Sequence, residues 1–404
     1  MDIAELLNLT LANKASDLHL ASGRPPIFRI YGEMTPHGTE IMTAAQVKDM
    51  LYSIMSEEQR ADYERDHEID FAITFGDNQR FRVNAFTQTN GPAAVMRTIA
   101  SNAPTLEALN CPAIFKRMAE MKNGIILVTG PTGSGKSTTL AAMVDHINRN
   151  FAKHILTVED PVEFVHTSKT ALINQREVGK HTKSFARALK SALREDPDVI
   201  LVGELRDLET IQLALSAAET GHLVLATLHT NSAPDSIDRI IDVFPAESKE
   251  MVRAMLANTL QGVITQMLLK KKGGGRCAAY EIMLGTPAVR NLVREGKIPQ
   301  LFSMMQMGAK LGMITMKDSI IQLLNNGLID PETAKYEMTN SFGKEEEVTA
   351  APTSAQAGKQ NTPAPAPAAP TPPAIQPAYV APTAGTAQSA APAQPKPRPA
   401  TGGF

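Results

Sequence analysis

A glycine-rich segment that ends in lysine and serine carries the clearest sign of chemistry in this sequence. It fits the pattern GxxxxGK[ST] plus one residue and consists of Gly130, Pro131, Thr132, Gly133, Ser134, Gly135, Lys136, Ser137 and Thr138. In such a loop backbone N–H groups turn inward around phosphates, Lys136 reaches the β- and γ-phosphates, and the Ser137 hydroxyl ligates magnesium. The segment therefore predicts a phosphate site that takes ATP and Mg²⁺. A glycine-rich turn that binds nothing is the structural alternative.

Polar side chains follow three apolar runs further along the chain. Glu163 lies in the acidic stretch 159–163 after the first run, Glu204 follows the second and His229 follows the third. Ligands of open α/β sheets bind outside the carboxyl ends of the strands, so we expect these side chains to converge on the phosphates. Hydrolysis needs one carboxylate near the magnesium and another that orients the attacking water. Glu204 is the better candidate for magnesium contact and Glu163 for water activation, although the two roles could be exchanged.

These polar residues also have structural interpretations. Glu159, Asp160 and Glu163 could form a solvated turn, which is the ordinary place for acidic residues. His222 and His229 could be histidines that serve only the fold, because a histidine near the end of a strand is not by itself a phosphate sensor. Of the two histidines, His229 is the better candidate for a site residue.

The segments that would position this site alternate between strand-like and helix-like patterns. Apolar runs of strand length, such as 125–128 and 199–202, are separated by segments with a helical period. One of these has Ser184 as a cap, an apolar stripe over 185–193, and Asp196-Pro197 at its end. The alternation predicts an α/β fold over residues 122–345, with a mainly parallel sheet covered on both faces.

The first hundred residues have a different pattern. Three stretches, 70–75, 80–86 and 94–97, alternate between apolar and polar residues and have turn residues between them. They predict antiparallel strands in a small α+β domain over residues 1–100. Residues 101–121, which begin with Ser-Asn-Ala-Pro, are then expected to form the hinge to the next domain.

The end of the chain has the composition of a linker. Residues 346–404 are dominated by Ala, Pro, Thr and Gln, and they hold about half of the 27 prolines of the chain. Such a segment cannot bury enough apolar surface to offset the entropy lost on folding. We therefore predict a disordered Pro/Ala-rich tail that catalysis does not need.

The overall composition narrows the class of protein. The 404 residues are 43% hydrophobic and carry a formal net charge of -2, so no charge excess favours nucleic acid as a partner. Cys111 and Cys277 belong to no CxxC pair, so neither a disulfide framework nor a zinc site is predicted. The N-terminus has no pattern of a secretory signal, and no apolar run reaches the roughly 20 residues that span a bilayer. We expect a cytoplasmic protein, for which any association with a membrane must occur through a partner.

Five segments together resemble the secretion-superfamily ATPases, and the match extends over about residues 1–340. They cover the Walker A, Asp box, Walker B and His box regions of that superfamily and lie at 130–138, 159–164, 192–198, 203–207 and 221–230. Residues 15–20, ASDLHL, also resemble the start of the superfamily's PAS-like domain. The resemblance implies a PAS-like N-terminal domain followed by a RecA-like P-loop ATPase domain.

Within that superfamily, residues 288–295, AVRNLVRE, are similar to a motif of the pilus retraction ATPases. The assembly and type II secretion ATPases usually carry a longer N-terminal region and a four-cysteine zinc insertion, which this sequence does not have. The resemblance implies an ATP-hydrolysing motor for type IV pilus retraction and twitching motility, which acts on the pilin fibre through an inner-membrane platform protein. A PilU-like accessory pilus ATPase and a RecA-like nucleic-acid translocase are alternatives. A regulatory module with little turnover agrees poorly with the presence of Lys136, Glu163 and Glu204.

The resemblance also implies a homohexamer with nucleotide at the seam between neighbouring subunits, and a PilU-like ATPase as a further partner. Arg82 and Arg97 match the family's arginines that reach the γ-phosphate at that seam. A guanidinium supplied across an interface couples hydrolysis to subunit motion, because it stabilises charge only when the domains close. Outward-facing arginines on a solvated sheet are the structural alternative.

Residues 287–295 predict one short helix. Thr286 is a good N-cap, Pro287 suits the first turn, and Gly296 suits the exit. Its apolar residues should pack inward, whereas Arg290 and Arg294 should form a basic pair on another side. We expect that side to pass nucleotide-driven movement to a neighbouring domain or to the platform protein. Arginines that are merely solvated are the alternative.

Overall fold

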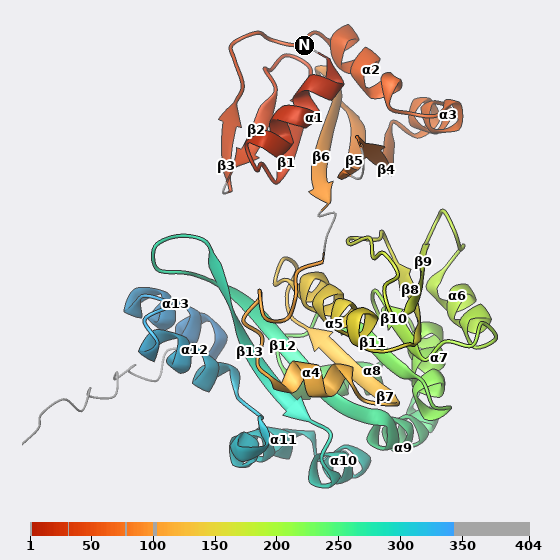
Figure 1. The fold of residues 1–404 in the computed structure, drawn as a ribbon, viewed down its shortest axis with the longest axis vertical. Helices are drawn as coiled ribbons and strands as arrows, with labels where there is room; N and C mark the ends of the chain where they lie inside the picture. Colours follow the sequence, from red (N-terminus) through yellow and green to blue (C-terminus); the bar gives the residue numbers. More distant parts are fainter. Residues whose placement is uncertain (1, 31, 77–78, 100–102, 343–404) are drawn as a thin grey trace, which may run out of the picture. The chain divides into compact units, whose positions relative to one another are not determined.

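Two β-sheets organise the chain in the computed structural model, which describes residues 2–30, 32–76, 79–99 and 103–342 (Figure 1). The tail predicted over residues 346–404 lies outside the described residues. Within the described ranges, no helix is both long enough and apolar enough to cross a membrane.

The first sheet is antiparallel and has the strand order β3-β2-β1-β6-β5-β4. Its strands are β1 (Asp17–Ala21), β2 (Ile27–Ile30), β3 (Glu33–Pro36), β4 (Glu68–Phe75), β5 (Gln79–Gln88) and β6 (Gly91–Ile99). Its helices are α1 (Ile3–Ala12), α2 (Ala44–Ser53) and α3 (Glu57–Asp66). The antiparallel strands predicted from period-two alternation are confirmed.

One face of the first sheet is apolar and the other is polar, as the alternation along β5 shows. Phe81, Val83 and Ala85 are fully buried in a core that includes residues of α1 and α2, whereas Arg82 between them is exposed. Because successive side chains of a strand point to opposite faces, the arginines of this sheet lie on the face that the helices leave open.

The second sheet has the order β13-β12-β7-β11-β10-β8-β9, in which β12 and β13 pair antiparallel and the other neighbours pair parallel. Its strands are β7 (Gly124–Thr129), β8 (His154–Glu159), β9 (Leu172–Glu177), β10 (Val199–Val202), β11 (Leu223–Leu228), β12 (Leu260–Lys270) and β13 (Arg276–Leu284). The α-helices of this part are α4 (Ile114–Ala119), α5 (Lys136–Asn150), α6 (Phe185–Ala192), α7 (Leu208–Glu219), α8 (Ala233–Asp242), α9 (Lys249–Thr259), α10 (Pro287–Arg294), α11 (Leu301–Met307), α12 (Met316–Asn325) and α13 (Pro331–Phe342). Short 3-10 helices lie at Ala246–Ser248, Ile298–Gln300 and Gly308–Leu311.

Helices cover both faces of this mainly parallel sheet, which confirms the predicted α/β fold. On one face α4 and α5 share a core with residues of β7, β10 and β11. On the other face helices α6 to α11 share a second core with the alternate residues of the same strands. A smaller core joins the β12–β13 pair to α12 and α13.

The structure differs from the expectation of a loose hinge over residues 101–121. From residue 103 onward the segment runs into α4, and Leu106, Phe115 and Met118 are buried in the same core as α5. The turn-forming residues at its start obscure these apolar anchors, which are too widely spaced to give a helical period. This part of the segment therefore belongs to the core of the second sheet, while residues 100–102 lie outside the described ranges.

Helix α6 begins as predicted but ends early. The Ser184 hydroxyl oxygen accepts a hydrogen bond from the Arg187 N–H at 3.2 Å, which confirms the cap. The helix ends at Ala192, and Leu193, expected in its apolar stripe, is 38% exposed. After Ala192 the chain turns, with the N–H groups of Arg194 and Glu195 donating to the backbone oxygens of Ser191 and Ala192.

Candidate nucleotide-binding site

The predicted phosphate loop joins β7 to α5 at the carboxyl edge of the parallel strands. Gly130 has a φ of 138°, and a Cβ atom there would lie 2.3 Å from the backbone oxygen of Gln266, so this position requires glycine. Gly135 leads directly into α5, a helix of 15 residues. The N-terminus of such a helix favours an anion through its unpaired N–H groups and its dipole, which is the environment a phosphate needs.

Lys136 lies folded against this loop. Its side chain is 8% exposed, and Nζ donates to the backbone oxygens of Gly130 at 3.0 Å and Pro131 at 3.1 Å. Burial lowers the pKa of Lys136, and the negative charges of Glu204 and Glu163 partly offset that effect. The ammonium is therefore held by neutral oxygens and keeps its charge available for an arriving phosphate.

His229 connects Lys136 to Glu204. The Lys136 Nζ lies 3.4 Å from His229 Nδ1, and His229 Nε2 lies 3.2 Å from Glu204 Oε1. A lysine ammonium can only donate, so this geometry suits a ring with an acceptor at Nδ1 and a proton on Nε2 that points to the carboxylate. The structure thus brings together three residues that the sequence places in separate segments.

Glu204 is held from a second side by the guanidinium of Arg206. The distance from Arg206 Nη2 to Glu204 Oε2 is 2.6 Å. Burial alone would raise the pKa of Glu204, but the hydrogen bond from Arg206 and the neighbouring His229 lower it below its usual value. This carboxylate is therefore ionised and oriented by two neighbours. The sequence analysis did not consider Arg206, although its place two residues after Glu204 could have drawn attention to it.

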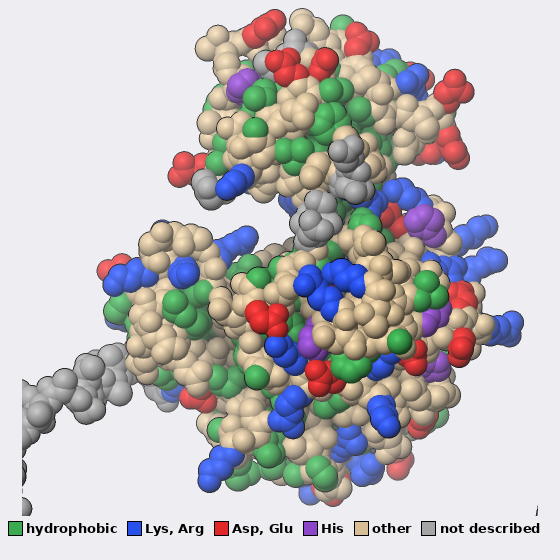
Figure 2. Space-filling model, viewed as in Figure 1, with side chains coloured by type: hydrophobic (Ala, Val, Ile, Leu, Met, Phe, Trp, Pro, Cys, Tyr) green, Lys and Arg blue, Asp and Glu red, His purple; other side chains and the backbone are tan. Residues whose placement is uncertain are grey.

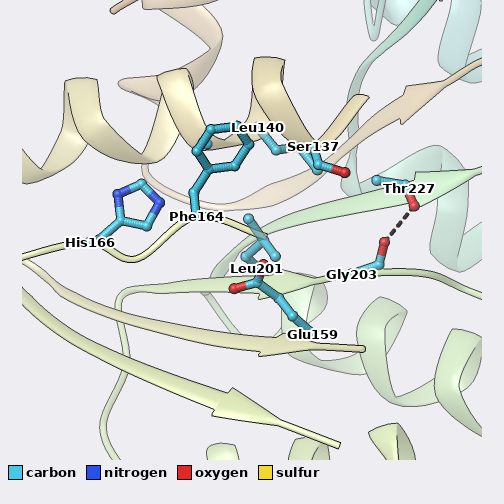
Figure 3. Close-up of a pocket in the computed structure, with 9 residues that line it drawn as sticks. Ser137, Leu140, Glu159, Phe164, His166, Leu201, Gly203 and Thr227 are labelled. Atoms are coloured by element: carbon cyan, nitrogen blue, oxygen red, sulfur yellow. Dashed lines mark hydrogen bonds between the residues drawn. The ribbon is translucent and has the colours of Figure 1, made fainter. Parts of the chain in front are cut away.

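The solvated-turn interpretation does not fit Glu159, the last residue of β8, although Asp160 and Glu163 in the same stretch are exposed. The Glu159 carboxylate accepts hydrogen bonds from the Thr157 hydroxyl at 2.7 Å and the Gln175 amide at 3.3 Å, and burial raises its pKa. It lines a cavity of about 30 Å³ that Ser137 and Gly203 also line (Figure 3). A half-buried acid therefore lies beside the loop residue expected to ligate magnesium.

Glu163, in contrast, is exposed to solvent at the end of this stretch. The backbone leading to it is fixed by Glu177, whose carboxylate accepts the Val162 N–H at 3.3 Å and pairs with Lys180 at 2.8 Å. Glu177 is only 5% exposed and lies at the end of β9. Glu163 thus combines a fixed backbone with access to water, and its charge acts on Lys136.

The polar groups at this edge fit a magnesium ion that is held mainly by phosphates. No cluster of three or more His, Cys, Asp or Glu side chains suited to a metal occurs in the described part of the chain. Magnesium at phosphate sites needs none, because it keeps several waters and takes one or two protein oxygens in addition to the phosphates. The Ser137 hydroxyl and the Glu204 carboxylate are the groups that could supply those oxygens.

Gln266 is a site residue that the sequence analysis missed. This side chain from β12 is 1% exposed, its Oε1 accepts the Thr139 hydroxyl at 2.8 Å, and its Nε2 donates to the Ser134 backbone oxygen at 2.6 Å. It fixes the phosphate loop to the first turn of α5. A glutamine inside a run of apolar strand residues was the available signal, because a buried amide must find partners.

A larger cavity of about 870 Å³ opens on the other side of the phosphate loop. Gly135 and Thr138 line it next to the loop, Leu109 and Leu268 give it apolar walls, and Tyr280 lies on β13. A volume of this size suits a ligand of several hundred cubic ångströms with apolar and polar parts.

Arg82 and Arg97 lie side by side on the open face of the first sheet. They are directly opposite each other on β5 and β6, and their side chains are 44% and 69% exposed. Arg82 pairs with Asp70 at 2.5 Å, and Arg97 Nε donates to Asp17 Oδ1 at 2.8 Å. The structure thus places both predicted arginines on one surface, where each is paired with a carboxylate of its own sheet.

His222 lies at the opposite end of β11 from His229. Its Nδ1 is 2.9 Å from the backbone oxygen of Ala217, at the end of α7. A strand of six residues separates the two histidines, so within this chain His222 lies at the amino edge of the sheet and away from the phosphate loop. The structural interpretation therefore fits His222, and the site interpretation fits His229.

Helix α10 forms as predicted, with the Thr286 hydroxyl oxygen accepting the Val289 N–H at 3.3 Å. The expected basic pair is wrong for Arg290, because this guanidinium turns inward. Its Nε donates to the backbone oxygen of Leu260 and its Nη2 to the side chain of Gln261, both at 3.0 Å. Arg290 thus satisfies a carbonyl at the junction of α9 and β12, where no helical N–H is available. Arg294 remains exposed and donates to Asn258 at 3.0 Å.

A glycine-rich loop with a buried lysine, followed by a carboxylate and a histidine at the carboxyl edge of a mainly parallel sheet, defines a P-loop ATPase. Comparison with known proteins gives the particular family. The family of Type II/IV secretion system proteins matches residues 2–295 of this chain. The chain therefore belongs to this family and is one of its nucleotide-binding ATPases.

Individual relatives refine this assignment. The type IV pilus retractation ATPase PilT of Pseudomonas aeruginosa is 55% identical over 335 residues, which are 83% of this chain and 97% of that protein. The type IV pilus ATPase PilU of the same species is 40% identical over 335 residues, which are 83% of this chain and 88% of that protein. A crystal structure of the pilus retraction motor PilT with bound ADP has a TM-score of 0.78 and 46% identity, and it covers 83% of this chain and 96% of that chain. The resemblance to the retraction ATPases is thereby confirmed, with PilU the more distant relative.

Proposed function

We propose that this chain is the Mg²⁺-dependent ATPase that drives retraction of type IV pili, and with it twitching motility. The observation that carries the proposal is the similarity to PilT over nearly the whole of that protein, together with the assembled phosphate site of Lys136, Glu204 and His229. PilU is the second candidate because it belongs to the same system, but its lower identity favours retraction by a PilT-like motor.

The phosphate loop and Lys136 bind the β- and γ-phosphates, and the cavity beside Thr138 has room for the base and sugar. The Ser137 hydroxyl and the phosphates would hold magnesium, which when bound would supply positive charge against the charge that develops on the γ-phosphate. Glu204, through its ionised carboxylate, contacts the magnesium directly or through water, and His229 lies where it can sense the γ-phosphate. Glu163 orients the attacking water, since it is exposed beside a loop whose backbone is fixed.

The motor works as a homohexamer in which Arg82 and Arg97 complete a neighbouring subunit's site. Their location on one open sheet face supports an approach to a second chain, because the described helices α1, α2 and α3 pack on the other face. The output passes to an inner-membrane platform protein and from there to the pilin fibre, with a PilU-like ATPase as an additional partner. The protein then lies in the cytoplasm and meets the membrane through these partners.

A nucleic-acid translocase is the alternative from another class. Acidic and basic side chains are mixed over the face shown in Figure 2, in agreement with the net charge of -2, and such a surface gives no field of one sign for a nucleic-acid backbone. The chain also has no Trp and only 5% aromatic residues for stacking bases.

The decisive experiment is complementation of a strain that lacks its retraction ATPase. The unaltered chain should restore pilus retraction, and Lys136→Ala should not, although it is produced at the same level. ATPase activity of the purified protein should be the same with and without single-stranded DNA. Restored retraction by Lys136→Ala, or turnover that depends on DNA, would contradict the proposal.

A further inference from the structure

A chain of buried hydroxyl groups lies behind the phosphate loop. The Thr265 hydroxyl on β12 is 2.8 Å from that of Thr129, the last residue of β7 before the loop. The Ser236 hydroxyl of α8 is 3.4 Å from Thr129 and 2.6 Å from Thr230, the residue after His229. Burying a hydroxyl group without a hydrogen-bond partner costs free energy, so these hydroxyl groups are expected to stay paired with one another. Their pairing fixes the loop after β11 to the base of the phosphate loop.

Glu281 lies beside these hydroxyl groups on the neighbouring strand. It lies directly opposite Thr265 in the β12–β13 pair and is only 3% exposed. One carboxylate oxygen accepts the N–H of Ala233, the first residue of α8, at 2.7 Å. The other accepts the N–H of Met316, the first residue of α12, at 3.4 Å. A single carboxylate therefore joins the starts of two helices that are more than 80 residues apart in the sequence.

The chemistry of helix ends explains why a carboxylate can be buried here. The first N–H groups of a helix have no partner within the helix, and the helix dipole places partial positive charge at this end. Burial raises the pKa of Glu281, while the two backbone N–H groups act in the opposite direction. If Glu281 were absent, two buried donors would lose their acceptor.

The position of α8 bears directly on the ATPase site. This helix begins four residues after His229, and its cap, Ser232, is followed by Ala233, the residue that Glu281 holds. His229 in turn lies between Lys136 and Glu204. A shift of the start of α8 would therefore move the histidine relative to the phosphates.

We propose that Glu281 is a positioning residue for ATP hydrolysis: it holds His229 in place through the start of α8 and couples the phosphate site to α12. The proposal rests on the ATP site described above and not on the role in pilus retraction. Helix α12 shares a small core with β13 and α13, so a movement of its start would be passed to the C-terminal helices.

Glu281→Gln tests the positioning role because the amide keeps the shape but has one oxygen acceptor instead of two. We expect kcat to fall about tenfold, since small displacements of catalytic groups have effects of this size, while the Kd for ADP changes less than about threefold. Glu281→Asp keeps the charge with a shorter reach and should recover part of kcat. The matched control is Asp145→Asn, which removes a carboxylate that is 4% exposed and pairs with Arg149 and Lys169. It should lower the melting temperature but change kcat less than about threefold.

Hydrogen exchange on the unaltered chain tests the coupling without any substitution. Addition of ADP should change amide protection at residues 229–236 and 315–319 together, and in Glu281→Gln only the first segment should respond. A kcat within about twofold of the unaltered value in Glu281→Gln, or an equal loss in Asp145→Asn, would overturn the positioning role. Unchanged protection at 315–319 on ADP binding would overturn the coupling. An unaltered chain that hydrolyses no ATP would instead contradict the ATPase assignment.

Discussion

Lys136 and the arginines of the first sheet are both predicted to act on the same phosphates, but their surroundings differ. The Lys136 ammonium is buried and donates to two neutral backbone oxygens. Arg82 and Arg97 are exposed, and each is paired with a carboxylate, Asp70 or Asp17. At Lys136 an arriving phosphate has to replace only neutral hydrogen-bond partners, whereas at either arginine it has to replace a carboxylate.

The positive charge of Lys136 is available to a phosphate at all times, whereas the charges of Arg82 and Arg97 become available only after they leave their carboxylate partners. Lys136 is preorganised, so its interaction with a phosphate requires little rearrangement. The arginines must exchange partners, and the exchange becomes favourable only when a phosphate approaches within hydrogen-bond distance. A motor needs both kinds of cation, because nucleotide has to bind before the subunits close and hydrolysis should follow closure.

The largest effect should come from Lys136→Ala. Removal of the preorganised charge should reduce ATP turnover by at least about a thousandfold, to the detection limit of a phosphate-release assay. Lys310→Ala removes an exposed lysine from a 3-10 helix and should leave turnover unchanged. Comparable turnover in Lys136→Ala and Lys310→Ala would show that Lys136 is not the phosphate-binding cation.

Glu163→Gln and Glu204→Gln should separate the two carboxylates by their surroundings. Glu163 is exposed, so its amide variant should lower kcat about a hundredfold and leave the Kd for ATP within about threefold. Glu204 orients His229 and Arg206, so its variant should weaken both binding and turnover. Turnover assays and equilibrium titrations with ATP measure the two quantities. Normal binding by both variants would contradict this division of roles.

The phosphate loop was predictable because it depends on backbone conformation, which glycine spacing encodes locally. Ser184 and Thr286 were predictable as helix caps because each side chain accepts a hydrogen bond from an N–H group only three residues further along the chain. The residues that support the loop from behind were not predictable: Gln266 and Glu281 come from strands more than 120 residues after the loop, and no sequence pattern marks their partners, which are backbone groups and the Thr139 hydroxyl.

The arginines of α10 show what a correctly predicted helix still leaves undetermined. The helix and its apolar face followed from the pattern, but the direction of Arg290 depended on an unpaired carbonyl at Leu260, which becomes visible only once α9 packs beside α10. A helical period predicts which side a residue occupies and leaves open whether the neighbouring surface is solvent or another chain segment.

Arg82→Ala or Arg97→Ala should lower turnover by about tenfold, the loss of one charge-assisted hydrogen bond, while ADP binding by each subunit is retained. The effect is smaller than that of Lys136→Ala because each arginine is shared with a carboxylate. Mixing tests whether the arginine acts on a neighbour. An Arg97→Ala chain combined with a Glu163→Gln chain should recover activity at seams where both intact groups meet. Absence of recovery at every ratio, with mixed rings confirmed by native mass spectrometry, would assign the arginine a role within its own chain or none.

Arg290 and Arg294 extend this comparison to α10, because both donate to neutral oxygens, as Lys136 does, but neither belongs to the phosphate loop. Arg290 is half-buried, so Arg290→Ala should leave the Leu260 carbonyl without this donor and lower the free energy of unfolding by about 1–2 kcal/mol. Arg294 is exposed, and Arg294→Ala should change stability by less than about 0.5 kcal/mol and ATP turnover by less than about twofold.

Of the two arginines of this helix, Arg294 is therefore the one exposed for contact with another domain or the platform protein, and Arg294→Ala should slow pilus retraction in cells while the purified protein keeps its ATPase activity. Chemical denaturation, phosphate release and a retraction assay on the same pair of variants measure these outcomes. Retraction at the normal rate in Arg294→Ala would remove the coupling role from α10. If Arg294→Ala instead lowers ATP turnover and retraction in the same proportion, Arg294 acts, like Lys136, on nucleotide binding or hydrolysis.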